Sequence, residues 1–156
     1  MPANPDPARA TLGALLPIYG QLGSSHALAN SLPWPWSCRV AGALSSWPAV
    51  EIYEAAALLD VVSSTRLVAQ VLRGARGVRV ADGRRVIAWG RLPVSAGVPA
   101  IEFRGGRRRV RRQAVAPAVV TSWCWVAVAS GRYDTVTVSY NRVVVRRRLR
   151  LSRSRP

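Results

Sequence analysis

The uneven distribution of charge along the chain limits most strongly how it can fold. The first 72 residues carry three arginines and four carboxylates, a net charge of −1. Residues 73–156 carry twenty arginines and three carboxylates, a net charge of +17. Because a buried, unpaired charge costs several kcal/mol, the arginine-rich segments must lie at the surface, at the edge of a sheet or against an anionic partner. The composition changes near residues 74–77, where we place the organisational boundary.

The length of 156 residues fits one small domain, and the apolar fraction of 49% is enough for a folded core. All 23 basic residues are arginine. A guanidinium group suits phosphate, but GC-rich codon usage gives the same composition and also accounts for the scarcity of Phe, Met and Ile. We therefore draw no functional conclusion from the absence of lysine, and rely on the charge itself.

The segment from about residue 48 to residue 73 is predicted to form one main helix. Pro48 suits a first helical turn, Glu51 and Glu54 suit the positive end of the helix dipole, and Gly74 follows as a stop signal. The run Ser63-Ser64-Thr65 leaves open a division into two helices. The following residues supply apolar surface at helical spacing: Val50, Tyr53, Ala57, Val61, Leu67, Val68, Val71 and Leu72.

From residue 78 onward, apolar residues recur with a period of two, which is typical of strands. Three turn signals divide this region into predicted hairpins: 78–81 with 84–92 around Asp82-Gly83, 98–104 with 107–112 around Gly105-Gly106, and 119–129 with 134–146 around Gly131. The sequence therefore predicts an α+β fold, in which the helix covers one face of an antiparallel meander of about six strands.

Two of the predicted strands differ in where they can lie. Residues 119–129 are apolar on both faces, so this strand should be central in its sheet. Residues 107–112 carry arginine on both faces, so this strand must lie at an edge, leave the sheet or follow a polyanion. The predicted organisation is an irregular N-terminal segment (1–47), an α+β core domain (48–145) and a flexible Arg-rich C-terminal tail (146–156).

Two uncharged runs require a check for targeting or membrane insertion. Ala27-Leu28-Ala29 has the form of a signal-peptidase site, but glycine and proline interrupt the apolar stretch before it, and we expect no cleaved signal peptide. Residues 113–131 have the length of a membrane span, but their Val, Trp and Pro content favours a buried strand. We expect an intracellular or virion location in preference to secretion, and no membrane span.

The sequence offers little for catalysis. It has one histidine, His26, and its Ser24-Ser25-His26 context lacks the pattern of a nucleophile elbow. No carboxylate pair, metal-ligand spacing or phosphate-binding loop stands out, and Cys38 and Cys124 are interpreted as buried free thiols. We therefore predict no catalytic residue, no metal, no cofactor and no enzymatic activity.

Polyanion binding is better supported, because the arginines form three clusters that can bind phosphate without reading base sequence. Trp89, Phe103, Tyr133 and Tyr140 are candidates for base stacking, although such residues are usually part of the core. The predicted partner is nucleic acid, RNA rather than DNA, or another polyanion. The predicted binding residues are Arg84, Arg85, Arg104, Arg107, Arg108, Arg109, Arg111, Arg112, Arg142, Arg146, Arg147, Arg148, Arg150, Arg153 and Arg155.

A short stretch resembles the first motif of Sm-like RNA-binding proteins. The resemblance rests on Val80-Ala81-Asp82-Gly83-Arg84 followed by Gly90-Arg91-Leu92, after a predicted helix. The spacing to Gly90 is longer than in that motif, and the downstream Asp and Met-Asn loop of that family is absent. The resemblance covers less than a tenth of the chain, and we assign no family from it.

The leading hypothesis is a non-enzymatic, nucleic-acid-associated structural protein of the virion or ribonucleoprotein type. A second hypothesis is an assembly subunit that docks a neighbouring protein through Trp34 and Trp36 of its Pro-Trp-Pro-Trp segment, with a homo-oligomer as one form of the assembly. A third is a young or unselected GC-rich reading frame without a defined activity. The agreement among turn, periodicity and capping signals opposes this third hypothesis.

Overall fold

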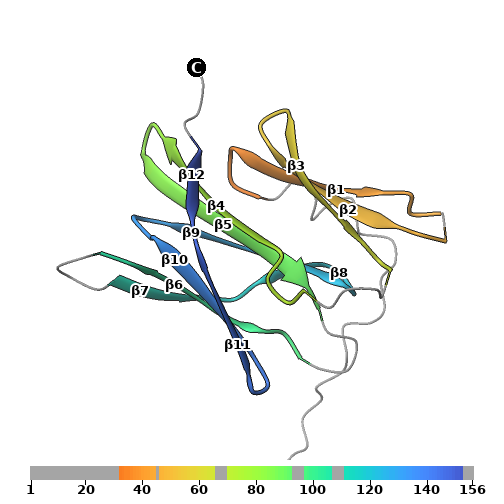
Figure 1. Ribbon diagram of the computed structural model, residues 1–156. Helices are drawn as coiled ribbons and strands as arrows, with labels where there is room; N and C mark the ends of the chain where they lie inside the picture. Colours follow the sequence, from red (N-terminus) through yellow and green to blue (C-terminus); the bar gives the residue numbers. More distant parts are fainter. Residues whose placement is uncertain (1–31, 45, 66–69, 93–96, 107–110, 153–156) are drawn as a thin grey trace, which may run out of the picture.

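The computed structural model describes residues 32–44, 46–65, 70–92, 97–106 and 111–152 (Figure 1). These residues form twelve β-strands in three sheets and no helix. The predicted α+β fold with one main helix and a single meander is therefore wrong, and the described fold is all-β.

A three-stranded sheet contains, in order, β1 (Trp36–Ala41), β2 (Ala49–Glu54) and β3 (Ala57–Ser63). A five-stranded sheet has the order β12 (Arg150–Ser152), β4 (Gly74–Val80), β5 (Gly83–Arg91), β9 (Cys124–Ser130) and β8 (Ala118–Thr121). A four-stranded sheet has the order β11 (Val143–Arg148), β10 (Thr135–Tyr140), β6 (Ala100–Gly105) and β7 (Arg111–Val115). All neighbouring strands are antiparallel except β12 and β4, which are parallel.

The predicted main helix is replaced by the β2–β3 hairpin. Val50 and Ile52 are fully buried, whereas Glu51 between them is only half-buried, which is the period of a strand. The β-branched and aromatic residues of this segment favour a strand, and this preference overrides the capping signals. Ala55 adopts a left-handed φ of 53° in the turn between the strands. Residues 66–69 of the predicted helix lie outside the described part.

The five-stranded sheet lies between the other two sheets (Figure 1). Alternate residues of its central strands enter two different cores. Val86 and Trp125 pack in the core shared with the four-stranded sheet, whereas Ile87 and Cys124 pack in the core shared with the three-stranded sheet. This arrangement explains why the sequence around β9 is apolar on both faces, and β9 has the predicted central position. The predicted extent, 119–129, is wrong, because residues 119–121 belong to β8, an edge strand that pairs back on β9.

The strand pairing of two predicted hairpins is confirmed, although their strand bounds and turns differ from the prediction. β4 pairs with β5, and Val80 lies opposite Gly83, so Ala81-Asp82 forms the turn one residue earlier than predicted. Gly83 adopts a φ of 136°, a conformation that favours glycine. β6 pairs with β7, and the connection between them is longer than the predicted Gly105-Gly106 turn. β7 is an edge strand, as its arginines require.

The third predicted hairpin is wrong, because β9 and β10 belong to different sheets. The chain crosses from one sheet to the other after Gly131, which has a φ of 144°. β9 instead pairs with β5 and β8, and β10 pairs with β6 and β11. The turn between β10 and β11 contains Asn141 with a φ of 51°, and asparagine tolerates this left-handed region well.

The predicted flexible C-terminal tail is wrong as far as residue 152. Residues up to Arg148 belong to β11, and the chain then crosses to the five-stranded sheet and forms β12. Leu149 is only 9% exposed at this crossing, and its amide donates to the Asp134 carbonyl at 2.9 Å. The Ser152 hydroxyl donates to Glu54 at 2.6 Å. These contacts hold a segment whose charge alone suggested a free tail.

The N-terminal segment is also more regular than predicted where the structure describes it. β1 places Trp36 and Cys38 in the core beneath the three-stranded sheet. Residues 1–31 lie outside the described part.

Candidate nucleic-acid interface

The two outer sheets of the fold differ in net charge, as the two halves of the sequence do. The strands of the three-stranded sheet carry one arginine and three carboxylates, a net charge of −2. The strands of the four-stranded sheet carry six arginines and one glutamate, a net charge of +5. The strands between them carry six arginines and no carboxylate. The two outer layers of the described fold therefore have charges of opposite sign.

One side of the four-stranded sheet faces the core and the other faces away from it. Ile101, Phe103, Val136 and Val138 are buried against the five-stranded sheet, so the residues that alternate with them point away from that core. We call this side the outer face. Its members, taken from the strand register, are Ala100, Glu102, Arg104, Arg112, Ala114, Thr135, Thr137, Ser139, Val144, Arg146 and Arg148.

The register places these residues in rows across the sheet. The first row, in strand order, is Arg148, Thr135, Arg104 and Arg112. The second row is Arg146, Thr137, Glu102 and Ala114. Neighbouring strands lie about 4.8 Å apart, and alternate residues of one strand about 6.8 Å apart. The Cα atoms of Arg148, Arg104, Arg112 and Arg146 therefore lie within roughly 16 Å of one another.

The positive charge of the outer face is largely uncompensated. Arg104 forms an ion pair with Glu102. In the part of the chain that the structure describes, Arg112, Arg146 and Arg148 have no carboxylate within ion-pair distance, and all three are exposed. These guanidinium groups can therefore bind an anion without first breaking an internal ion pair.

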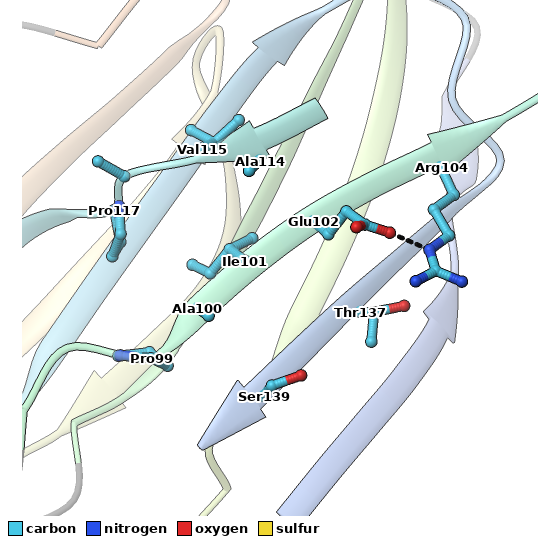
Figure 2. A pocket seen from close by; sticks show the side chains of 11 residues that line it. Pro99, Ala100, Ile101, Glu102, Arg104, Ala114, Val115, Pro117, Thr137 and Ser139 are labelled. Carbon is cyan, nitrogen blue, oxygen red and sulfur yellow. Dashed lines mark hydrogen bonds and ion pairs between the residues drawn. The ribbon is translucent and has the colours of Figure 1, made fainter. Parts of the chain in front are cut away.

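An open groove of about 420 Å³ lies on the outer face, and Arg104 is among its lining residues (Figure 2). Apolar side chains form much of its wall: Pro99 just before β6, Ala100 in β6, Ala114 in β7 and Pro117 after β7. Figure 2 shows Glu102 directed toward Arg104, with the hydroxyl groups of Thr137 and Ser139 on the neighbouring strand.

The other predicted arginines are spread over the fold. Arg85 of β5 forms an ion pair with Asp82 at 2.7 Å and donates to the Trp34 carbonyl at 2.6 Å, so it is already engaged. Arg147 donates to the Arg73 carbonyl. Arg84 lies on β5, Arg111 on β7, Arg142 in the β10–β11 turn and Arg150 on β12. Arg107, Arg108, Arg109, Arg153 and Arg155 lie outside the described residues.

Three of the four aromatic stacking candidates are core residues. Phe103 is fully buried, Trp89 donates to Asp60 at 2.8 Å, and the Tyr133 hydroxyl donates to Gln113 at 2.5 Å. Tyr140 is half-buried. The outer face, as the register defines it, contains no aromatic side chain, so stacking on these residues is not available there.

The two tryptophans of the predicted docking segment have different surroundings. Trp36 is 3% exposed and belongs to the core beneath the three-stranded sheet, so a partner protein cannot reach it. Trp34 is 67% exposed. Trp47, in the β1–β2 connection, is 68% exposed.

A polar cluster between the three- and five-stranded sheets has a structural role. Asp60 accepts two hydrogen bonds from Arg73, at 2.7 and 3.0 Å, and one from Trp89. Burial raises the pKa of Asp60, but these hydrogen bonds and the charge of Arg73 outweigh it and hold the pKa below its usual value. Within the described ranges, no three His, Cys, Asp or Glu side chains gather as metal ligands.

The two cysteines are buried free thiols, as predicted. Burial raises the pKa of Cys38 to about 12. Burial also raises the pKa of Cys124, with a further contribution from Cys38. Both groups therefore stay protonated at neutral pH, and neither is an activated nucleophile.

Sequence reasoning missed the polar residues of the outer face other than arginine. The alternation of Thr135, Thr137 and Ser139 with valines indicates a solvated strand face. It does not indicate which strands lie on either side. Only the register shows that β11 and β6 place Arg146, Arg148 and Arg104 beside these hydroxyl groups.

A scan against protein-family models, a search of curated proteins and a search of solved structures each found no match to this chain. The resemblance to Sm-like RNA-binding proteins is thus limited to residues of the β4–β5 hairpin and the residue after it. The described residues include no helix that is long and apolar enough to cross a membrane.

Proposed function

We propose that this chain is a non-enzymatic, nucleic-acid-associated structural protein that binds the phosphate backbone through the outer face of its four-stranded sheet. The observation that carries the proposal is the row of Arg148, Arg104 and Arg112 with Arg146 beside it, opposed on that face by the single carboxylate of Glu102. Release of counterions from phosphate supplies affinity to such a surface without base recognition.

The hydroxyl groups of β10 support the same chemistry. Thr135 lies between Arg148 and Arg104 in the first row, and threonine and serine hydroxyls commonly bind phosphate oxygens alongside arginine. A virion or ribonucleoprotein component that packs RNA, or another polyanion, needs contacts of this kind and no sequence specificity. RNA remains the favoured partner in this proposal.

Filter binding of the nuclease-treated protein to RNA at salt concentrations from about 50 to 200 mM tests the proposal. We expect affinity to fall steeply over this range. Arg148→Gln should lower the magnitude of the slope of log affinity against log salt by about 0.7 for single-stranded RNA. Arg39→Gln, which removes one charge from the three-stranded sheet, is the matched control and should leave the slope nearly unchanged. A flat salt dependence, or equal slopes for the two variants, would contradict the proposed interface.

A second candidate function is protein assembly, favoured by the apolar side chains exposed around the three-stranded sheet. Trp34 lies before β1, Leu44 and Trp47 lie in the β1–β2 connection, and all three are largely exposed. Exposed apolar groups mark protein contacts where they form a contiguous patch. Light scattering after size-exclusion chromatography of nuclease-free protein should then show a homo-oligomer that Trp34→Ser weakens. A monomer at all concentrations would count against self-assembly.

A further inference from the structure

The groove on the outer face combines apolar walls with a few polar groups (Figure 2). Its volume of about 420 Å³ falls within the range of small-molecule sites, about 300–1,000 Å³. Ala100, Ala114 and Pro117 offer an apolar surface, and Glu102, Thr137 and Ser139 supply oxygen atoms. Small apolar side chains of this kind leave room for a flat ring.

Glu102 does not fit a surface that binds phosphate alone. A carboxylate repels phosphate, yet Glu102 lines the groove together with Arg104. Its Oε1 accepts a hydrogen bond from Arg104. Its Oε2 has no partner among the described atoms and can accept a hydrogen bond from an N–H group.

The hydroxyl group of Thr137, next to Glu102, lacks a hydrogen-bond partner in the described part of the fold. Thr137 lies directly opposite Glu102 on β10, and its Oγ1 is shielded from solvent. A buried polar group without a partner is destabilising. A polar ligand group that entered the groove between Glu102 and Ser139 would satisfy it.

We propose that this groove holds one nucleobase of the bound strand, and that it favours a base with an exocyclic amine. The amine would donate to Glu102, and the base would lie on the apolar wall. Arg104, about 6.8 Å along β6 from Glu102, and Arg146 in the same row as Glu102 would bind the flanking phosphates. Cytosine, with its N4 amine, is the probe of choice, whereas uracil presents a carbonyl oxygen at that position. This inference rests on the proposed function.

Fluorescence anisotropy with single-stranded RNA probes of about 12 nucleotides tests the inference. The probes are oligocytidine, oligouridine and an abasic strand with the same number of phosphates. We expect oligocytidine to bind at least about tenfold more tightly than the other two, as one charge-assisted hydrogen bond predicts.

Glu102→Ala separates the base contact from the phosphate contacts. It should remove the preference for oligocytidine and, because Arg104 loses its carboxylate, raise the affinity for the abasic strand. The control Glu51→Ala removes one carboxylate from the three-stranded sheet, where Glu51 pairs with Arg39, and should keep the preference. Ala114→Leu fills the groove without changing charge and should also remove the preference, so the test does not depend on one variant folding.

The outcomes separate this inference from the proposed function. Equal binding of all three probes, or a preference that survives in folded Glu102→Ala or Ala114→Leu protein, would overturn the base site and leave phosphate binding intact. Failure of every probe to bind, including the abasic strand, would overturn both.

Discussion

Replacement of Leu149 by alanine tests whether the C-terminal arginine-rich segment is part of the fold. Leu149 is 9% exposed where the chain crosses from β11 to β12, and it belongs to the core between the four- and five-stranded sheets. Leu151, two residues further on, is 50% exposed. The same substitution at the two positions therefore compares a buried contact with a partly exposed one in the same segment.

The expected magnitudes follow from this difference in burial. A Leu→Ala change at a well-buried site lowers the free energy of unfolding by about 2–5 kcal/mol. Leu149 lies near the margin of the core, so we expect about 2–3 kcal/mol there. For Leu151, which loses only part of its area on folding, we expect about 1 kcal/mol or less. At about 3 °C per kcal/mol for a chain of this size, the melting temperature should fall by roughly 6–9 °C for Leu149→Ala.

Thermal unfolding followed by circular dichroism measures both variants against the native chain. A cooperative melt with a large shift for Leu149→Ala and a small one for Leu151→Ala is the predicted result. Unchanged melting temperatures for both variants would show that the segment is a free tail and that the described crossing is incorrect. A broad melt without a transition in the native protein would instead favour an unselected reading frame without a defined fold.

Three further results are expected. Gly90→Ala should unfold the protein or lower its stability by more than about 2 kcal/mol, because an added Cβ would meet the Val71 carbonyl oxygen at 1.8 Å; a normal melt would contradict this packing. Cys38 and Cys124 should react with a thiol reagent only after denaturant is added, and fast labelling of native protein would refute their burial. Asp60 has a lowered pKa in the folded state, so it stabilises the fold above its unfolded pKa of about 3.9, and this contribution is lost as the pH falls through the lower folded value. Denaturant titrations should therefore show that Asp60→Asn has a lower free energy of unfolding than the native chain at neutral pH, and that this difference disappears in acid. A difference that does not change with pH would contradict the ion pair.

Turn residues and apolar runs in the sequence correctly predicted two hairpins and one central strand. Asp82-Gly83 and Gly105-Gly106 correctly indicated the β4–β5 and β6–β7 hairpins, although the exact turns differ. The apolar sequence around Trp125 correctly indicated a central strand. Such features depend on backbone preference and on burial, which neighbouring residues largely determine.

The features that sequence reasoning missed depend on contacts between distant segments. The apolar residues after Pro48 fit both the spacing of a helix and that of a strand. Packing of Val50 and Ile52 on the five-stranded sheet favours the strand over the helix. Gly131 marks a crossing between sheets where a hairpin was predicted. The arrangement of residues on the outer face could not be predicted from the sequence for the same reason. Its rows join β11, β10, β6 and β7 through a register that no single segment determines.

The most direct test of the proposed interface is a map of backbone amide shifts in the NMR spectrum as RNA is added at moderate salt. The predicted result is a set of shifts concentrated on β6, β7, β10 and β11, around Arg104, Arg112 and Arg148, with little change around Arg39 and Glu51 of the three-stranded sheet. Shifts confined to the three-stranded sheet, or spread evenly over the described fold, would contradict phosphate binding by the outer face.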